Sequence, residues 1–267
     1  MTKELRNSNV KLGRKPILSP TKFATYIECA LKYRYVYVDK IGRFFLRARP
    51  GYSFGSTLHQ ALRAFHQDAL DEEQLVEKLD SSWISSGYSS PDEEVEHRAA
   101  GEEMLRSYAA AALTRGEHER ETIWTEKSFR TDLGPFILTG RMDRVDRYPD
   151  GALEVIDYKS GRLETTEEEV AADLSMGIYQ LILRKTCPGA RVFATIYCLK
   201  TGARASAEMG DARAAEFESD ILALGNEIIS RDYENLEPVR IEACDECDFL
   251  RKCERFWRYR ERAERLD

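Results

Sequence analysis

A chain of 267 residues with 42% hydrophobic residues can bury a full core as one large domain. Its 40 Lys and Arg against 47 Asp and Glu give a net charge of −7, which argues against a protein that passively coats nucleic acid. The chain shows no signal peptide and no transmembrane run. We therefore expect a cytoplasmic protein with reduced cysteines and no membrane partner.

The N-terminal region is basic. Residues 1–49 hold twelve Lys and Arg against three Asp and Glu. Residues 1–16 are polar, and we expect them to form a disordered tail. The remaining residues, 17–267, are expected to form one domain.

Helical patterning dominates the next stretch. Ser56 or Thr57 is a candidate N-cap for a helix with apolar residues at helical spacing, which would also carry His59. A lone histidine on a helix is more often a packed or surface residue than a metal ligand. We expect helices over residues 56–121, and a helical insertion at about 60–122 that precedes the strands.

The strands are expected over about 123–200, interrupted by one helix from about 166 to 184, and a further helix is expected over 211–231. Tyr148-Pro-Asp-Gly151 has turn chemistry between two extended runs. This pattern indicates a mixed α/β core with the helical insertion before it.

The hairpin around that turn carries the most informative residues. Two registers are possible, and they place Asp143 opposite either Ile156 or Asp157, with cross-strand Cβ atoms roughly 4.5–5.5 Å apart. Asp157 and Lys159 are two apart, so they share one face of their strand. Oxygen ligands of this kind suit Mg²⁺ or Mn²⁺. The alternative interpretation is a surface hairpin with ordinary charge pairs.

A cysteine cluster lies near the C-terminus, at Cys244, Cys247 and Cys253. Three closely spaced thiols indicate a metal or iron–sulfur site that needs a fourth ligand, for which Cys29 is a candidate. Cys187 and Cys198 are rivals, although Cys198 sits in an apolar run that favours a buried position. The spacing leaves zinc and iron–sulfur open.

Taken together, these motifs resemble the RecB-like branch of the PD-(D/E)XK nucleases, particularly the iron–sulfur exonucleases. The resemblance covers about Leu18 to Cys253 and follows the family's order. It contains Gly55-x-x-x-His59, the acidic motif ending at Asp143, and Asp157-x-Lys159. The family's Gln-x-x-x-Tyr appears here as Ser175-x-x-x-Tyr179, with serine in place of glutamine.

The resemblance implies a restriction-endonuclease-like fold with a mixed sheet flanked by helices, and a Mg²⁺- or Mn²⁺-dependent deoxyribonuclease. His59, Asp143 and Asp157 are the implied metal ligands, and Lys159 and Tyr179 are the implied catalytic partners. Cys29, Cys244, Cys247 and Cys253 are the implied ligands of a [4Fe-4S] cluster, with Zn²⁺ as the alternative.

The expected activity is exonuclease digestion of single-stranded DNA ends, in DNA repair and recombination or in CRISPR adaptation. The chain contains no Gly-Lys dipeptide and hence no phosphate-loop motif, so a separate helicase or a CRISPR integrase is a possible partner. Two alternatives stay open: a catalytically weak DNA-binding subunit with the nuclease fold, and a redox-responsive protein that uses the cluster as a sensor.

Overall fold

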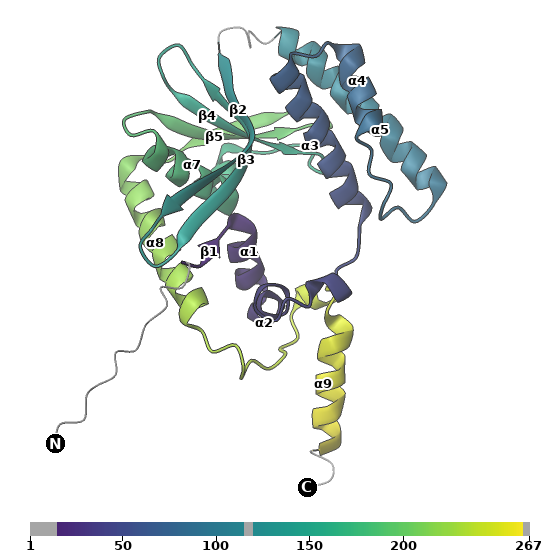
Figure 1. Ribbon diagram of the computed structural model, residues 1–267, viewed down its shortest axis with the longest axis vertical. Helices are drawn as coiled ribbons and strands as arrows, with labels where there is room; N and C mark the ends of the chain where they lie inside the picture. Colours follow the sequence, from purple (N-terminus) through teal and green to yellow (C-terminus); the bar gives the residue numbers. More distant parts are fainter. Residues whose placement is uncertain (1–14, 115–119, 264–267) are drawn as a thin grey trace, which may run out of the picture.

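The computed structural model describes residues 15–114 and 120–263, and it is built around a six-stranded mixed sheet (Figure 1). The predicted tail falls almost wholly outside the described residues. The strands are β1 (Ile17–Leu18), β2 (Glu121–Asp132), β3 (Ile137–Arg147), β4 (Leu153–Lys159), β5 (Val192–Cys198) and β6 (Arg204–Glu208). The α-helices are α1 (Pro20–Glu28), α2 (Ala30–Tyr33), α3 (Pro50–Asp68), α4 (Glu72–Ser81), α5 (Pro91–Thr114), α6 (Glu167–Ala172), α7 (Leu174–Thr186), α8 (Asp211–Ser230) and α9 (Leu250–Ala263). The short helical segments are η1 (Arg34–Val38), η2 (Gly42–Phe44) and η4 (Glu242–Cys244).

The sheet runs in the order β1-β3-β4-β5-β6, and β2 pairs with β3 along nearly its whole length. One edge of β3 is therefore taken by β2, and β1 and β4 must share the other. β1 pairs in parallel at Ile137 and Leu138, and β4 pairs antiparallel from Arg144 to Arg147. Between those two contacts, residues 139–143 of β3 have no neighbour on that edge among the described strands.

Two apolar layers cover the sheet. One face packs against α1, α7 and α8 through residues such as Val145, Val155 and Ile182. The other packs against α3, α4 and α5 through Ile156 and Tyr158. Alternate residues of β4 enter different layers because strand side chains alternate between faces, so the strand is buried on both sides.

The predicted helices are present, but their boundaries differ from the predicted ones. α3 begins at Pro50, so the N-cap predicted at Ser56 or Thr57 is wrong: Pro50 occupies the first helical turn, where its missing N–H costs nothing. The helix expected over 166–184 is divided at Asp173, whose carboxylate caps α7 by accepting from the backbone N–H groups of Ser175 and Met176. The helix expected over 211–231 is α8.

Candidate active site

The β3–β4 hairpin adopts the second of the two predicted registers. Arg144 pairs with Ile156, and the Tyr148 N–H donates to the Ala152 carbonyl at 2.9 Å. Continuing that register places Asp143 opposite Asp157, where the two strands begin to separate. The Tyr158 N–H, freed from strand pairing there, donates to Asp143 Oδ2 at 2.9 Å. The two carboxylates therefore lie near each other at the open edge of β3.

His59 reaches this edge from α3. α3 passes close to the end of β4 here, because a Cβ on Gly55, one turn before His59, would make an ordinary contact of 3.6 Å with Ser160 Oγ. His59 Nε2 donates to the Tyr158 carbonyl at 3.1 Å, and Nδ1 lies 3.2 Å from Asp143 Oδ1. Burial lowers the pKa of His59, but hydrogen bonds to Asp143 and Glu126 and the charges of Asp143 and Asp157 outweigh it and raise the pKa to about 10. Without metal, the imidazole is therefore a cation held between carboxylates.

Glu126 is the site residue that the sequence reasoning missed. In β2, the pairs Thr125–Arg144 and Lys127–Met142 bracket it, so it lies opposite Asp143. Its Oε1 lies 3.5 Å from His59 Nδ1, and its Oε2 pairs with Arg141 Nε at 2.6 Å. Glu126 also has φ of 46°, a left-handed conformation that is uncommon outside glycine and often found at functional sites.

Asp157 and Lys159 form an ion pair beside this group, with Oδ2 and Nζ 2.6 Å apart. Burial and then the charge of Asp143 raise the pKa of Asp157. Burial lowers the pKa of Lys159, but the charge of Asp157 outweighs that effect and the pKa lies above its ordinary value. Lys159 is thus a permanent cation, suited to stabilising negative charge rather than to removing a proton.

Tyr179 enters the site from α7. Its ring packs on β3 at Gly140, where an added Cβ would lie 2.9 Å from the ring carbons. Burial raises the pKa of Tyr179, and the charges of Asp157 and Asp143 raise it further. The hydroxyl therefore lies within electrostatic range of both carboxylates. Ser175 lies in the first turn of α7, where its N–H is held by Asp173.

A cleft of about 870 Å³ opens beside these residues. His59, Glu126, Asp143 and Lys159 line it together with the N-terminal half of α3. Arg63 and Arg141 add two further cations to its wall. The cleft therefore places carboxylates for a cation beside positive groups for an anion.

A buried polar network supports β3 and β4 from the opposite face. Arg144 binds Asp146 through two nitrogens, and its Nη1 donates to His66 Nε2 and to the Tyr108 hydroxyl, both at 2.8 Å. The Tyr108 and Tyr158 hydroxyls lie 2.8 Å apart. Tyr158 sits between Asp157 and Lys159 in the chain, so this network fixes the strand that presents both.

Within the described ranges, one group of three metal-binding side chains comes together with ligand atoms inside 4.8 Å: His59, Glu126 and Asp143. One nitrogen and two carboxylates suit Mn²⁺ and, through the oxygens, Mg²⁺. Asp157 lies next to this group and is paired with Lys159. The predicted ligands His59 and Asp143 are thus brought together, with Glu126 as a third donor.

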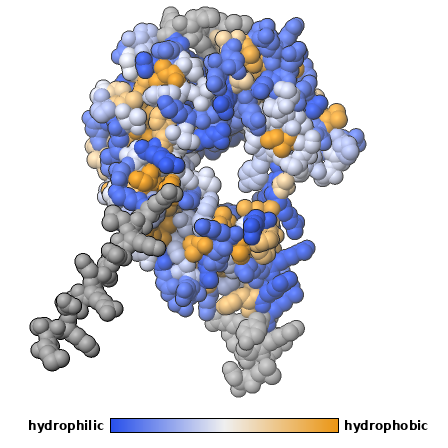
Figure 2. Space-filling view, viewed as in Figure 1, coloured by the Kyte–Doolittle hydropathy of each residue, from blue (hydrophilic) through white to orange (hydrophobic). Residues whose placement is uncertain are grey.

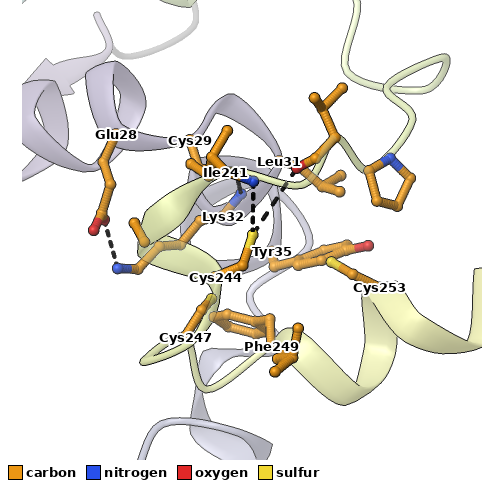
Figure 3. Close-up of a pocket in the computed structure, with 14 residues that line it drawn as sticks. Glu28, Cys29, Leu31, Lys32, Tyr35, Ile241, Cys244, Cys247, Phe249 and Cys253 are labelled. Carbon is orange, nitrogen blue, oxygen red and sulfur yellow. Dashed lines mark hydrogen bonds and ion pairs between the residues drawn. The ribbon is translucent and has the colours of Figure 1, made fainter.

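The second predicted site also assembles in space. Cys29, Cys244, Cys247 and Cys253 line a single pocket with Tyr35 and Phe249, although Cys29 lies far from the others in the chain (Figure 3). All four are free thiols. Cys29 caps α2 and its sulfur accepts from the Lys32 N–H at 3.4 Å, while Cys244 Sγ accepts from the Ile241 N–H at the same distance. Burial and then the neighbouring Cys247, Cys29 and Cys244 raise the pKa of Cys253 to about 11.

The two rival cysteines lie elsewhere. Cys198 is fully buried in β5, as its apolar run predicts, and Cys187 forms the C-terminal cap of α7. Neither lines the four-cysteine pocket.

The family to which this chain is similar agrees with this architecture. Residues 17–254 match the PD-(D/E)XK nuclease superfamily. No curated protein matches. Among solved structures, the crystal structure of SSO0001 is 14% identical, with a TM-score of 0.33 over 73% of this chain and 82% of that one. No helix in the described parts of the chain is long and apolar enough to span a membrane. With its restriction-endonuclease-like mixed sheet, the chain belongs to the PD-(D/E)XK nuclease superfamily.

Proposed function

We propose that the protein is a Mg²⁺- or Mn²⁺-dependent DNA exonuclease of the RecB-like iron–sulfur branch. The observation that carries the proposal is the open edge of β3. There Asp143 lies with His59 and Glu126, and the Asp157–Lys159 pair lies beside them.

His59, Glu126, Asp143 and Asp157 would hold the cation, which lowers the pKa of bound water and neutralises charge on a phosphate. Lys159 remains protonated and stabilises the negative charge that builds up on the scissile phosphate. Tyr179 stays neutral, because its pKa is raised, and can donate a hydrogen bond to the substrate backbone. The buried network behind Tyr158 keeps Asp157 and Lys159 in place.

A single-stranded substrate is supported by the shape of the molecule. Figure 2 shows an opening through it, which the ribbon view places between β3, α3 and the α1–α2 segment. The catalytic cleft is lined by residues of β3 and α3. The chain has no phosphate-loop motor, so an exonuclease of this kind would receive open strands or work with a separate helicase or CRISPR integrase.

Assay of the metal-dependent nuclease activity of Asp143→Ala, Asp157→Ala and Lys159→Ala tests the proposal. Each should lose hydrolysis of single-stranded DNA with Mn²⁺ present while keeping a cooperative melting transition. Full turnover by Asp157→Ala would refute this assignment. Inactivity of the unmodified protein with every divalent metal would favour the alternative of a DNA-binding subunit.

The four-cysteine pocket supports an iron–sulfur cluster over a single zinc ion. A tetrahedral zinc with bonds of about 2.3 Å holds its sulfurs about 3.8 Å apart. No three of the four thiols lie within 4.8 Å of one another, as judged over the described residues, which is a wider spacing than a tetrahedral zinc site requires. The backbone N–H groups that reach Cys29 and Cys244 are the kind of donor that tunes cluster sulfurs.

The cluster is proposed to be structural. Protein purified without air should be brown and contain iron and sulfide, and Cys29→Ala should lose both as fully as Cys247→Ala does. Cys187→Ala and Cys198→Ala should keep them. Stoichiometric zinc without iron would reject the cluster but leave the pocket a metal site. A cluster sensor is the alternative, and it predicts nuclease activity that changes when the cluster is reduced.

A further inference from the structure

A second polar cleft, of about 500 Å³, lies beside the four-cysteine pocket. Its walls are residues 43–47, between α2 and α3, and the start of α9, which lie side by side in Figure 1. The lining side chains are Arg43, Phe44, Phe45, Leu46, Arg47, Asp248, Arg251, Lys252 and Arg255. None of them belongs to the catalytic cleft.

The charge of this cleft is strongly positive and locally uncompensated. Five of its side chains are cationic and one, Asp248, is anionic. Asp248 is already engaged by Arg49 Nη2 at 3.3 Å and by the Arg47 N–H at 3.4 Å. None of the five cations forms an ion pair with a carboxylate of residues 15–114 or 120–258, although ion pairs are common elsewhere on the surface. Such a set of cations without carboxylate partners suits a ligand that carries several negative charges.

An aromatic side chain is presented together with these charges. Phe44 is 69% exposed, and the Arg43 guanidinium lies 4.6 Å from its ring centre. The neighbouring Phe45 instead packs on Phe249, with ring centres 5.2 Å apart. Phe44 therefore contributes little to the core, and its exposed ring, with Arg43 beside it, is available for stacking with a nucleobase.

The start of α3 joins this cleft to the catalytic one. Arg49, the N-cap of α3, donates to the Glu246 carbonyl at 2.6 Å and contacts Asp248, which lines the basic cleft. Three residues later, Tyr52 is 72% exposed and lines the catalytic cleft. Residues 49–52 thus connect the wall of the basic cleft to the wall of the catalytic cleft.

We propose that the cleft between residues 43–47 and 248–255 is a separate binding site for single-stranded DNA. Its cations bind backbone phosphates, and Phe44 stacks on a base outside the catalytic cleft. The choice of ligand rests on the proposed nuclease function, but the site is distinct from the catalytic residues.

Binding of a labelled oligodeoxythymidylate of roughly 20 nucleotides, measured by anisotropy without divalent metal, tests the site apart from hydrolysis. In the variant Arg47→Gln/Arg251→Gln/Arg255→Gln, the slope of log affinity against log salt should shrink by about 2, since each single-strand phosphate contact contributes about 0.7. Phe44→Ala should weaken binding by about 5- to 150-fold.

The matched control Arg191→Gln/Lys200→Gln/Arg213→Gln removes the same charge from exposed positions elsewhere and should behave like the unmodified protein.

Hydrolysis of a trinucleotide, which is too short to fill both clefts, provides the second measurement. The triple cleft variant should retain the trinucleotide rate while its KM for the long strand rises. An unchanged salt slope, or loss of trinucleotide hydrolysis with a normal melting curve, would overturn the proposal. If the unmodified protein binds the strand with the expected slope but hydrolyses nothing, the cleft stands and the nuclease function fails.

Discussion

The fold places the buried carboxylate of Asp157 near that of Asp143. In the metal-free protein, this arrangement lowers the free energy of unfolding. Its folded pKa lies above the unfolded value, so the ionised form destabilises the fold at neutral pH. We predict that Asp157→Asn raises the free energy of unfolding of the metal-free protein at pH 7 by on the order of 2 kcal/mol. Urea unfolding at several pH values measures the effect.

The stability advantage of Asp157→Asn should depend on pH, because it comes from the charge of Asp157. As the pH falls toward the unfolded pKa, the folded protein takes up the proton first and the penalty disappears. The advantage of Asp157→Asn should therefore vanish near pH 4. Asp220→Asn, on the exposed face of α8, is the control and should show no such advantage. A stabilisation that is independent of pH would contradict the electrostatic explanation.

Glu126 is expected to be a metal ligand, although no motif marked it. Glu126→Gln keeps the size of the side chain but removes one anionic oxygen from the group with His59 and Asp143. We predict that the Mn²⁺ concentration for half-maximal nuclease activity rises by about tenfold or more, within the range known for weakened metal sites. The control is Glu121→Gln, which alters an exposed pair in the same strand. An unchanged metal titration would exclude Glu126 from the site.

His66 must stay neutral in the folded protein, because its Nε2 accepts from Arg144. Burial and then the charge of Arg144 lower the pKa of His66 to about 2. The unfolded chain binds a proton near pH 6.5 and the folded one does not, so stability falls below that pH by about 1.4 kcal/mol per unit. We predict that His66→Gln removes this part of the slope between pH 6.5 and 5 in chemical unfolding. If the free energy of unfolding of both proteins changed with pH by the same slope, the assigned role of His66 would be wrong.

At the scale of the elements, α7 can pack closely on β3 because Gly140 of β3 has no side chain. An alanine at Gly140 would place Cβ 2.9 Å from the Tyr179 ring, so the ring must move. We predict that Gly140→Ala lowers stability by about 1–3 kcal/mol and reduces kcat more than KM, because Tyr179 leaves the carboxylates. Thermal unfolding and steady-state kinetics measure the two effects.

Gly210→Ala is the matched control, since a Cβ there would meet no atom within 4 Å. It should change stability by a few tenths of a kcal/mol and leave activity intact. Normal kinetics in Gly140→Ala would show that Tyr179 is not needed at its present position.

The sequence predicted the hairpin well because its signals are local. A Pro-Asp-Gly turn and alternating residues set the register, and the structure selects one of the two expected alternatives. Glu126 was missed because its partner Asp143 lies across a different hairpin, the one that turns between Asp132 and Ile137. The Gly134-Pro135 turn there was the available signal, and extending its register leads to Glu126.

The start of α3 was misjudged for a different reason. Capping residues such as Ser56 are common inside helices when tertiary packing continues the helix past them, and a proline in the first turn was the stronger signal. The buried ion pairs of Arg144 with Asp146 and of Arg120 with Glu154 also carry no local signal, because only the packed helices of the other layer show that solvent is excluded from this face.

At the scale of the whole molecule, the opening in Figure 2 predicts a need for strand ends. We expect the protein to digest linear single-stranded DNA much faster than a closed single-stranded circle of the same sequence, with no response to ATP. A circle cannot be threaded, whereas a free end can enter. Equal rates on both, followed by gel electrophoresis over time, would mean that the strand enters sideways and that the enzyme is an endonuclease.

The four-cysteine pocket has a consequence for the order of events during protein synthesis. Cys29 leaves the ribosome early, but Cys253 is made more than 200 residues later, which at 5–20 residues per second is about ten seconds or more. All catalytic residues emerge in between. If the cluster joins the two ends of the domain, the nascent chain carries a complete set of catalytic side chains before the basic cleft beside α9 exists. Cluster insertion would then serve as the last maturation step, so that a cell short of iron would accumulate immature protein that holds DNA poorly.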